Sequence, residues 1–572
     1  MTFLLNDPAD FADEALVGMV AAFPGHVRPV HGGVARATKV PAGQVALVVG
    51  GGSGHYPAFA GWVGQGFAHG APCGNIFASP AAAQVYSVCK AAHTGGGVLL
   101  GFGNYAGDVL HFGQAAQRLR AEGIDVRIVP VTDDIASGDP GQPHTRRGIA
   151  GDLPVYKIAG AAAAAGLDLD EVERLTRKAN DRTRSLGYAF SGCRLPGAPE
   201  PLFTVPAGQM SLGLGIHGEP GISDAPMATA AEVATQLVDR ILAEPPAEGS
   251  RLAVLFNGLG TVKYEELFVA YGTVAQTLAD RGYQVVEPIV GEQVTSLDMA
   301  GVSLTVTWLD DELEPLWLAP CDTPSLRRGA VDVAERVAAA DEWSDAPAEV
   351  PPASSASQAL AGRIAAALGD VHRMLAAKEP YLGRIDAIAG DGDHGIGMLR
   401  GARAADESAQ QSVAAGAGAA TLLARAGDAW AERAGGTSGA LWGAALGAAA
   451  RLLDDQTVSG RDTIPAAVRA AVEAILGLGG AAVGDKTMVD AAVPFKDAFT
   501  DPTTAGADQW PAAVAVASEA ARRTAEYAAK RGRSKNHAEA SIGTPDPGAI
   551  SFALITETLT PHIAGTATAP AG

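Results

Sequence analysis

Two hydrophobic patterns divide the chain into regions of different secondary structure. Up to about Thr323, short β-branched runs alternate with Gly- and Asp-rich loops and with helical stretches. This alternation predicts an α/β region with largely parallel sheets, because helical crossovers connect strands that run in the same direction. The predicted strands are residues 44–49, 97–101, 126–131, 252–257 and 302–308. Ligands of such sheets bind beyond the carboxyl ends of strands, so the loops after Val49, Gly101 and Val131 are the first candidates for a site.

The second pattern begins after a segment without apolar periodicity. This segment, DEWSDAPAEVPPASSAS, is rich in Pro, Ser, Ala and acidic residues, a composition typical of a flexible linker. Beyond it, Ala- and Leu-rich segments with helical periodicity predict an all-α bundle. Their ranges are 360–375, 415–430, 440–453, 466–478, 512–530 and 550–558. We therefore expect an α/β region at 1–335 with two subdomains that meet near 190–250, a linker at 336–357 and a helical domain at 358–572.

Composition and charge narrow the class of protein. The chain has 42 basic and 63 acidic residues and a formal net charge of −21, which repels phosphate polymers and argues against a nucleic-acid partner. The first 22 residues contain no basic residue, unlike a secretory signal peptide. No run of ~20 apolar residues predicts a membrane span. The four cysteines lack CxxC spacing, which fits a reducing compartment. We therefore expect a cytoplasmic protein without a membrane partner.

Three loops of the α/β region contain candidate chemistry. The first, VVGGGSGHYP at 48–57, offers free backbone N–H groups together with Ser53 and His55, and it matches neither the Walker loop nor GxGxxG. The second, GFGNYAGDVLHF at 101–112, contains Asp108, and the third, LGLGIHGEPG at 212–221, sets His217 among glycines. Each loop also has a structural explanation: a tight glycine turn, a helix-capping aspartate and a hydrogen-bonded surface histidine, respectively.

The helical domain contains its own cluster of polar motifs. In RIDAIAGDGDHGIG at 384–397, Asp386, Asp391 and Asp393 fall within eight residues, and carboxylates this close repel one another unless a cation neutralises them. Oxygen ligands without His or Cys partners favour Mg²⁺, although a solvated acidic helix junction is the alternative explanation. In AGGTSGALWGAAL at 434–446, Thr437 and Ser438 stand where a helix begins, a position that suits phosphate. GDKTMVDA from residue 484 and KRGRSKNHAEASIGTPDPGA at 530–549 complete the set.

Taken together and in this order, GGGSGH, GNYAGD and GIHGEPG resemble the ketose-binding domain of the dihydroxyacetone kinases. The resemblance extends over the first 330 residues and includes TSLDMAGVSLT at 295–305. It implies that His217 forms a covalent hemiaminal with the substrate carbonyl, which would separate ketones from polyols. It implies that Asp108 draws the proton from the terminal hydroxyl and that His55 hydrogen-bonds the substrate and assists. The substrate-binding set implied by the match is Gly52, Ser53, Gly54, Asp108 and His217.

The helical motifs resemble the nucleotide-binding domain of the same kinases. That resemblance implies an antiparallel barrel of eight helices that binds ATP through two Mg²⁺ ions, because phosphoryl transfer depends on charge neutralisation and alignment. The implied metal ligands are Asp386, Asp391 and Asp393. The implied ATP-binding residues are His394, Gly395, Ile396, Gly397, Thr437, Ser438, Gly479, Met488, Arg533, Asp546, Pro547 and Gly548. A homodimer, in which a nucleotide domain docks on the partner subunit, is implied as well.

The sequence thus predicts an ATP-dependent kinase that phosphorylates a terminal hydroxyl of a small ketose. Two alternatives stay open: a ketose sensor or coregulator without catalysis, and a lyase that forms cyclic FMN from FAD as a side activity. The exact ketose is open too, because Tyr56, Gly103 and Ala106 depart from the GHEP and KNYTGD pattern of dihydroxyacetone-specific relatives. Loss of a lysine at Gly103 is expected to enlarge the pocket, so we expect activity on D- or L-erythrulose as well as on dihydroxyacetone.

Overall fold

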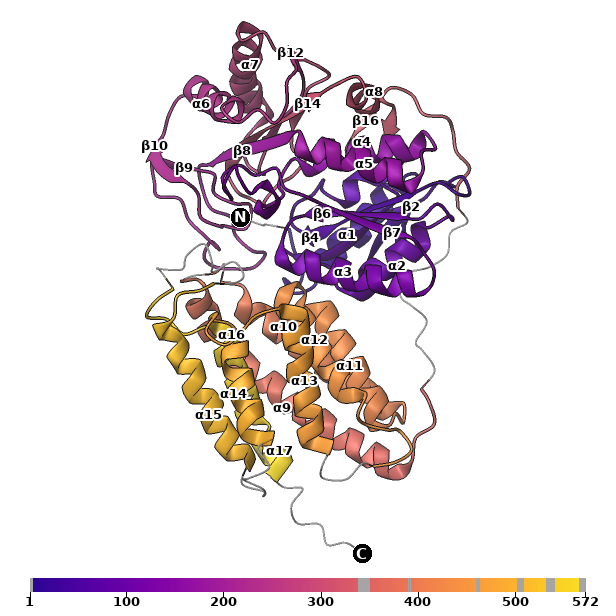
Figure 1. The fold of residues 1–572 in the computed structure, drawn as a ribbon, viewed down its shortest axis with the longest axis vertical. Helices are drawn as coiled ribbons and strands as arrows, with labels where there is room; N and C mark the ends of the chain where they lie inside the picture. Colours follow the sequence, from indigo (N-terminus) through magenta and orange to yellow (C-terminus); the bar gives the residue numbers. More distant parts are fainter. Residues whose placement is uncertain are drawn as a thin grey trace, which may run out of the picture. The chain divides into compact units, whose positions relative to one another are not determined.

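The computed structural model describes residues 4–337, 350–388, 390, 392–458, 463–500, 509–530 and 541–564. The chain folds into two compact units, Met1–Ala346 and Pro347–Gly572, which are described separately. The first contains both strands and helices, whereas the described part of the second contains helices and no strand (Figure 1). This division confirms the predicted change from an α/β to an all-helical fold along the chain.

The first unit is built from two sheets and their covering helices (Figure 1). Its helices are α1 (Phe11–Ala22), α2 (Ala82–Ala92), α3 (Ala106–Ala121), α4 (Asp152–Ala164), α5 (Leu169–Asp181), α6 (Ala230–Leu242), α7 (Tyr264–Asp280) and α8 (Leu313–Leu318). The strands of its first sheet are β1 (Val27–Val30), β2 (Gly33–Arg36), β3 (Ala46–Val49), β4 (Gly51–Ser53), β5 (Gly70–Ile76), β6 (Val98–Gly103) and β7 (Val126–Val131). The strands of its second sheet are β8 (Thr183–Ala189), β9 (Gln209–Leu212), β10 (Ser223–Pro226), β11 (Arg251–Gly258), β12 (Gln284–Val285), β13 (Ile289–Gly291) and β14 (Gly301–Leu309). A small two-stranded sheet joins β15 (Cys321–Asp322) to β16 (Arg327–Arg328).

The first sheet has the order β1-β2-β5-β3-β6-β7, and the consecutive strands β5, β3, β6 and β7 pair in parallel as predicted. Helices cover both faces, because successive residues of a strand point to opposite sides. In β3, Ala46 and Val48 join the core under α2 and α3, while Leu47 and Val49 face the core that contains α4 and α5. All four residues of β3 are apolar and buried, as expected for a strand covered on both faces, whereas β7 at the edge of the sheet is buried at three of its six positions.

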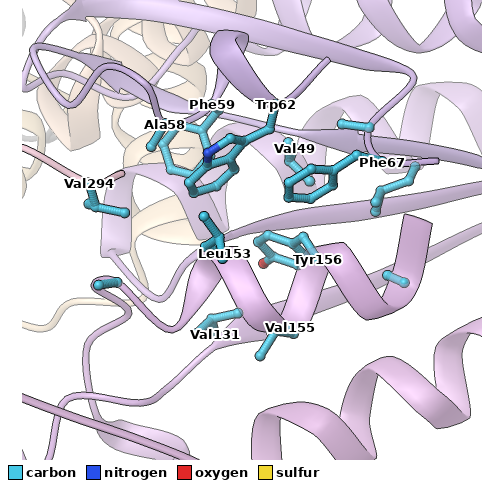
Figure 2. Packing of buried hydrophobic residues seen from close by; sticks show 14 of the residues in the cluster. Val49, Ala58, Phe59, Trp62, Phe67, Val131, Leu153, Val155, Tyr156 and Val294 are labelled. Atoms are coloured by element: carbon cyan, nitrogen blue, oxygen red, sulfur yellow. The ribbon is translucent and has the colours of Figure 1, made fainter. Parts of the chain in front are cut away.

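Aromatic rings fill the core on the α4 side of the first sheet. Trp62 and Phe67 stack with ring centroids 5.7 Å apart, and Leu153 and Tyr156 of α4 are directed toward them (Figure 2). The buried hydroxyl of Tyr156 donates to the carbonyl oxygens of Phe102 and Val129, both at 3.0 Å, so this core leaves the phenol satisfied. The packing fixes α4 against the strand ends that carry the candidate loops.

The second sheet corrects the expectation of largely parallel pairing throughout this region. Its order is β10-β9-β8-β14-β11-β12, and the pairs along β10, β9, β8, β14 and β11 are antiparallel, with only β12 and β13 parallel to β11. Alternation of strands and helices reveals which segments are strands but not which neighbours they choose. Here β14 returns between β8 and β11, a placement decided by packing against α6 and α7.

The second unit is a ring of helices in which each helix packs on the next one along the chain. The ring comprises α9 (Ser355–Asp386), α10 (His394–Ala414), α11 (Ala419–Ala434), α12 (Gly436–Ala450), α13 (Thr463–Gly479), α14 (Val489–Thr500), α15 (Gln509–Arg523) and α16 (Pro547–Thr558), followed by the short α17 (Thr560–Ala564). Because α16 packs back on α9, the ring closes into the predicted helical barrel. In the described part of the chain, no helix has the length and apolar character needed to cross a bilayer.

Small residues allow the barrel helices to approach closely. A side chain at Gly395 would lie 2.3 Å from the carbonyl oxygen of Glu379, and one at Gly401 would lie 2.6 Å from the indole nitrogen of Trp430. Alanines on α9 and α10 fill the rest of the contact. This packing places the end of α9 directly beside the start of α10, where the acidic motif lies.

Candidate active site

The first candidate loop follows β3, contains the short strand β4 and leads to His55. Gly52 and Gly54 are required by the backbone, since a side chain at Gly52 would lie 2.8 Å from the amide nitrogen of Ala78, and Gly54 has φ +97°. Ser53 donates its hydroxyl hydrogen to the carbonyl oxygen of Gly74 at 2.6 Å. In this structure the predicted binding residues Gly52, Ser53 and Gly54 therefore shape the loop, and the glycines leave room for the 77–79 segment.

His55 and His217 form a buried pair. Their Nε2 atoms lie 3.0 Å apart, although 162 residues separate them in the chain, and their exposed fractions are 4 % and 6 %. The ring of Phe77 stacks on His55 with a centroid separation of 4.9 Å and meets His217 edge-on at 5.2 Å. An apolar wall of this kind excludes water from the pair. The structure thus brings two of the predicted catalytic residues into direct contact.

The loop between β13 and β14 holds both histidine loops. The Nδ1 atom of His55 lies 2.7 Å from the carbonyl oxygen of Thr295, and the amide of Leu297 donates to the carbonyl of Gly54 at 2.9 Å. The hydroxyl of Ser296 donates to the carbonyl of Ile216 at 2.5 Å, next to His217. These contacts give the segment that begins at residue 295 a structural role, because it holds the loops of His55 and His217 in place. Its composition alone does not reveal this role.

Glu219 is a site residue that the sequence reasoning missed. It is 7 % exposed, and its two carboxylate oxygens lie 3.0 Å from Nδ1 and from the backbone nitrogen of His217. The guanidinium of Arg147 approaches the same carboxylate at 3.8 Å and contacts Asp134 at 2.9 Å. The glutamate of GIHGEPG could have been singled out because it lies two residues after the histidine. The motif alone, however, does not show that the two side chains form a hydrogen bond. Arg147 left no comparable signal in the sequence.

The start of α3 lies at the histidine pair. Tyr105 precedes this helix, and its ring meets that of His217 edge-on with centroids 5.0 Å apart. Burial, followed by the nearby charge of Glu219, raises the pKa of the Tyr105 phenol well above its usual range. Asp108 stands in the first turn of α3, is 8 % exposed and accepts a hydrogen bond from the hydroxyl of Ser79 at 2.7 Å. The N-cap residue of α3 is Tyr105, so Asp108 lies inside the first turn of the helix and not at its cap position.

The acidic motif of the helical unit lies between α9 and α10. Asp386 ends α9 and accepts a hydrogen bond from the backbone nitrogen of His394 at 3.1 Å. Burial, followed by repulsion from Asp386, raises the pKa of Asp393 to about 7. Two carboxylates that disfavour each other's charge fit a bound cation, because a divalent ion would neutralise both. Asp391 lies outside the described residues, and among the residues that the structure describes, this motif included, no cluster of three or more His, Cys, Asp or Glu side chains could hold a metal ion.

A second acidic group faces the same motif from the start of α16. Asp546 caps this helix by accepting a hydrogen bond from the backbone nitrogen of Ala549 at 2.7 Å. Burial raises its pKa to about 7, in spite of that bond and with a contribution from Asp386. A small hollow is lined by both carboxylates and by Lys486, whose ammonium donates to the carbonyl oxygens of Tyr527 and Ser541. This hollow brings the predicted residues Asp386, Asp546 and Pro547 together with Lys486, which was not predicted.

The remaining predicted nucleotide residues occupy helix ends or helix starts. Ile396 and Gly397 belong to the first turn of α10, and the ring of His394 lies 2.9 Å from the hydroxyl of Ser551. Thr437 and Ser438 are in the first turn of α12, where Gly435 has φ +59°. Gly479 ends α13. Met488 is buried against Gly548, beyond Pro547 at the start of α16. Arg533 lies outside the described residues.

Comparison with known proteins gives the family. Residues 17–325 match the Dak1 domain and residues 388–561 match the DAK2 domain. The chain is 58 % identical over 569 residues to the L-erythrulose 1-kinase of Mycolicibacterium smegmatis, covering 98 % of this chain and all of that protein. It is 55 % identical over 565 residues to the L-erythrulose kinase of Pectobacterium atrosepticum, covering 97 % and 95 % of the two chains.

A solved structure leads to the same family. The dihydroxyacetone kinase of C. freundii in complex with AMP-PNP and Mg²⁺ is 31 % identical, with a TM-score of 0.53 over 98 % of this chain and 99 % of that chain. Both the order of the two domains and the full-length coverage agree with the two units of the fold. The chain therefore belongs to the dihydroxyacetone kinase family, in which one polypeptide joins a Dak1 domain to a DAK2 domain.

Proposed function

We propose that this chain transfers a phosphoryl group from ATP to a terminal hydroxyl of a small ketose that is held covalently on His217. The observation that carries the proposal is the buried pair of His55 and His217, whose Nε2 atoms are 3.0 Å apart. The chain is an ATP-dependent ketose kinase, as its full-length relatives support. We assign ketose binding to the first unit and nucleotide binding to the second.

Capture of the ketose uses the nucleophilic nitrogen of His217. Because Nδ1 of His217 faces the carboxylate of Glu219 at 3.0 Å, the lone pair available for attack is on Nε2. Attack on the carbonyl carbon forms the N–C bond of a hemiaminal, and the carbonyl oxygen takes a proton from His55. A covalent bond to a carbonyl selects ketones over polyols, which offer no such carbon, and it fixes a small substrate that has few other handles.

Transfer requires a base at the terminal hydroxyl and neutralisation of the triphosphate. Asp108 is the base in this proposal, and its bond to Ser79 at 2.7 Å keeps the carboxylate oriented. Asp386, Asp391 and Asp393 would hold Mg²⁺, which supplies charge neutralisation for the phosphates when bound. The raised pKa of Asp393, about 7, supports this assignment because a cation would relieve the repulsion that causes part of the shift.

The substrate class that we favour is the four-carbon ketose. Two relatives that match this chain over nearly its whole length are named L-erythrulose kinases, and a D-erythrulose kinase is 52 % identical. Gly103 packs closely on the neighbouring backbone, since a side chain there would meet the carbonyl oxygen of Gly148 at 3.0 Å. A lysine at this position, as in dihydroxyacetone-specific relatives, would require this backbone or the nearby ring of Tyr105 to move, so the preference proposed here rests on the relatives. We propose that erythrulose and dihydroxyacetone are both phosphorylated, with erythrulose preferred.

The test measures ADP formation by the full-length chain with ATP, Mg²⁺ and one of four acceptors. Dihydroxyacetone, D-erythrulose and L-erythrulose are expected to support turnover, and glycerol, which lacks a carbonyl, is expected to support none. A preference for dihydroxyacetone above about a hundredfold in kcat/KM contradicts the four-carbon assignment, because one added CH(OH) group changes affinity by only ~1–3 kcal/mol in a tolerant pocket. Ketose binding without any ADP would support a sensor instead of a kinase.

A second activity follows from one of the relatives. The human triokinase/FMN cyclase is 35 % identical over 576 residues and covers 96 % of this chain. We propose that formation of cyclic FMN from FAD, if this chain performs it, uses the acidic residues of the helical unit. Incubation with FAD and a divalent cation, with and without the substitution Asp386→Asn, measures this activity. We further propose a homodimer in the cytoplasm, which size-exclusion chromatography with light scattering and cell fractionation would check.

A further inference from the structure

A buried chain of charged side chains extends from His217 through Glu219. Its members are Asp134, Arg147 and Glu219, with exposed fractions of 2 %, 8 % and 7 %. Arg147 donates through Nε and Nη2 to one oxygen of Asp134, at 3.0 and 2.9 Å, and its Nη1 lies 3.8 Å from Glu219. Charged side chains are rarely buried unless they are paired, so the burial of these three groups indicates a role at His217, where the series ends.

The loop that carries Arg147 is held rigidly. Asp133 accepts hydrogen bonds from the backbone nitrogens of Ile149 and Gly151 at 2.8 and 2.7 Å. The backbone nitrogen of Arg147 donates to the hydroxyl of Ser137 at 2.8 Å, and its carbonyl accepts from the nitrogen of Asp134 at 3.1 Å. With its loop fixed at this many points, the guanidinium has a defined position behind the carboxylate of Glu219.

The hydrogen bonds of the histidine pair determine how many protons it holds. The carbonyl oxygen of Thr295 can only accept, so Nδ1 of His55, at 2.7 Å, is protonated. The two Nε2 atoms are 3.0 Å apart, and two lone pairs at that distance would repel, so one proton lies between them. One more proton lies between Nδ1 of His217 and Glu219. The three residues therefore hold three protons.

Two arrangements of these protons are possible, and they differ in chemistry. If Glu219 is protonated, it donates to Nδ1 of His217, and Nε2 of His217 carries hydrogen and cannot attack. If Glu219 is ionised, Nδ1 of His217 carries hydrogen, and the proton between the rings can reside on His55. Only the second arrangement leaves His217 with a nucleophilic Nε2 and His55 with a proton to give.

We propose that Arg147, anchored by Asp134, is a positioning residue that keeps Glu219 ionised and so places the proton of this cluster on the histidine pair. The positive guanidinium favours the charged carboxylate, and the backbone N–H of His217 adds a hydrogen bond to it. This inference rests on the proposed capture of the ketose at His217. The step then balances: Nε2 of His217 forms the bond to carbon, the carbonyl π bond breaks, and its oxygen receives the proton of His55. The positive charge moves from His55 to the His217 adduct, beside Glu219.

Other charged groups near the cluster leave this assignment intact. Tyr105 faces His217 from the start of α3, and burial keeps its phenol neutral by raising its pKa. Asp108 lies further along α3, and its carboxylate accepts a hydrogen bond from the hydroxyl of Ser79. Phe77 covers the pair with an apolar ring. Among the groups that face Glu219, Arg147 is thus the cation that decides its charge, and its pKa stays high because Asp134 and Glu219 outweigh the lowering by burial.

The test compares Arg147→Met with Arg146→Met in the full-length chain. Arg146 is the preceding residue, is completely buried and pairs with Glu244 at 2.7 Å, a carboxylate that also bonds Arg184. Both substitutions break a buried ion pair, but only one acts on Glu219. Formation of the adduct is followed across pH by ¹³C NMR of a ketose labelled at C2, and steady-state kinetics are measured in parallel.

We expect Arg147→Met to lower kcat/KM for the ketose by about 100-fold, the contribution of one well-placed proton donor, with KM for ATP unchanged. Loss of a nearby positive charge raises the pKa values of the cluster, so the profile of adduct formation should move to higher pH by about one unit. Arg146→Met should lose thermal stability and keep the wild-type profile. A wild-type profile in Arg147→Met, or an equal shift in Arg146→Met, overturns the inference.

A second measurement covers the case in which Arg147→Met does not fold. The ¹⁵N chemical shifts of the wild-type chain labelled at histidine, assigned with His55→Asn and His217→Asn, report which ring nitrogens carry hydrogen. We expect Nδ1 of both residues to be protonated, and an unprotonated Nδ1 of His217 contradicts the proposal. Absence of any adduct at His217 in the wild-type chain removes the proposed function together with this inference, whereas an adduct with an unchanged pH profile removes the inference alone.

Discussion

The two candidate sites of this protein are prepared for their ligands in opposite ways. In the first unit, His55, His217 and Glu219 satisfy one another through hydrogen bonds of 3.0 Å, with a countercharge from Arg147. In the helical unit, Asp386 and Asp393 crowd together, and burial with mutual repulsion raises the pKa of Asp393 to about 7. In the proposed covalent site the side chains already satisfy one another, whereas the proposed nucleotide site brings together carboxylates whose repulsion a bound cation would relieve.

The largest effect is expected from removing one carboxylate of the helical unit. Asp386→Asn should lower kcat by about 10³- to 10⁵-fold, the scale seen when one charge that stabilises phosphoryl transfer is lost. Adduct formation at His217 should persist, because it needs no nucleotide. Asp454→Asn is the control, since this exposed aspartate only caps the turn at residues 456 and 457. A wild-type rate and an unchanged Mg²⁺ dependence in Asp386→Asn would contradict the assignment.

Removal of the covalent anchor should have the next largest effect. His217→Ala should lower kcat/KM for the ketose by about 10³-fold, because the substrate loses the bond that fixes it for transfer. Calorimetry should find ATP binding unchanged. His144→Ala, at an exposed position of the same unit, should behave as wild type. If His217→Ala retains full turnover, covalent capture has no role in the reaction and the contrast between the two sites fails.

A smaller effect is expected from Lys486, which lines the hollow that contains Asp386 and Asp546 and is not one of the predicted ligands. Lys486 is 5 % exposed, and its ammonium donates to the carbonyl oxygens of Tyr527 and Ser541. Lys486→Met should raise KM for ATP by about 10- to 100-fold, which corresponds to the loss of hydrogen bonds from a charged group. Lys496→Met, at a surface ion pair with Asp497, is the matched control. An equal rise of KM in both variants would make Lys486 unimportant for ATP.

The smallest effect concerns the choice of ketose. Gly103→Lys restores the residue of dihydroxyacetone-specific relatives, and its side chain must displace the backbone at Gly148 or the ring of Tyr105, at 3.0 and 3.2 Å. The ratio of kcat/KM for erythrulose to that for dihydroxyacetone should fall by about 10-fold, the usual effect of one small steric change in a pocket. Gly113→Lys, on the open face of α3, controls for the added charge. An unchanged ratio places the selectivity elsewhere in the site.

Local patterns were sufficient to predict much of the fold. The range 126–131 coincides with β7, and 302–308 falls within β14, because both runs are rich in β-branched residues, which favour strands. The helical ranges were less sharply bounded: the segment predicted at 360–375 extends as α9 from Ser355 to Asp386. Helix ends depend on capping and on contacts that periodicity does not contain, and here the end of α9 is what delivers the first carboxylate of the acidic motif.

The sequence by itself predicted catalytic or metal-binding roles for His55, Asp108, His217 and the acidic motif, because their types and spacings form recognisable motifs. It did not determine the pairing of the second sheet, in which β14 enters between β8 and β11. Nor did it determine the role of Arg147, which lies 72 residues from Glu219 and meets it only in the folded chain. Sequence motifs record residues that touch one another locally or touch the substrate. A residue such as Arg147, which contacts another side chain of the site, reaches that side chain only through tertiary packing. The reason is that a buried charge needs a counterion, and the counterion can come from any part of the chain.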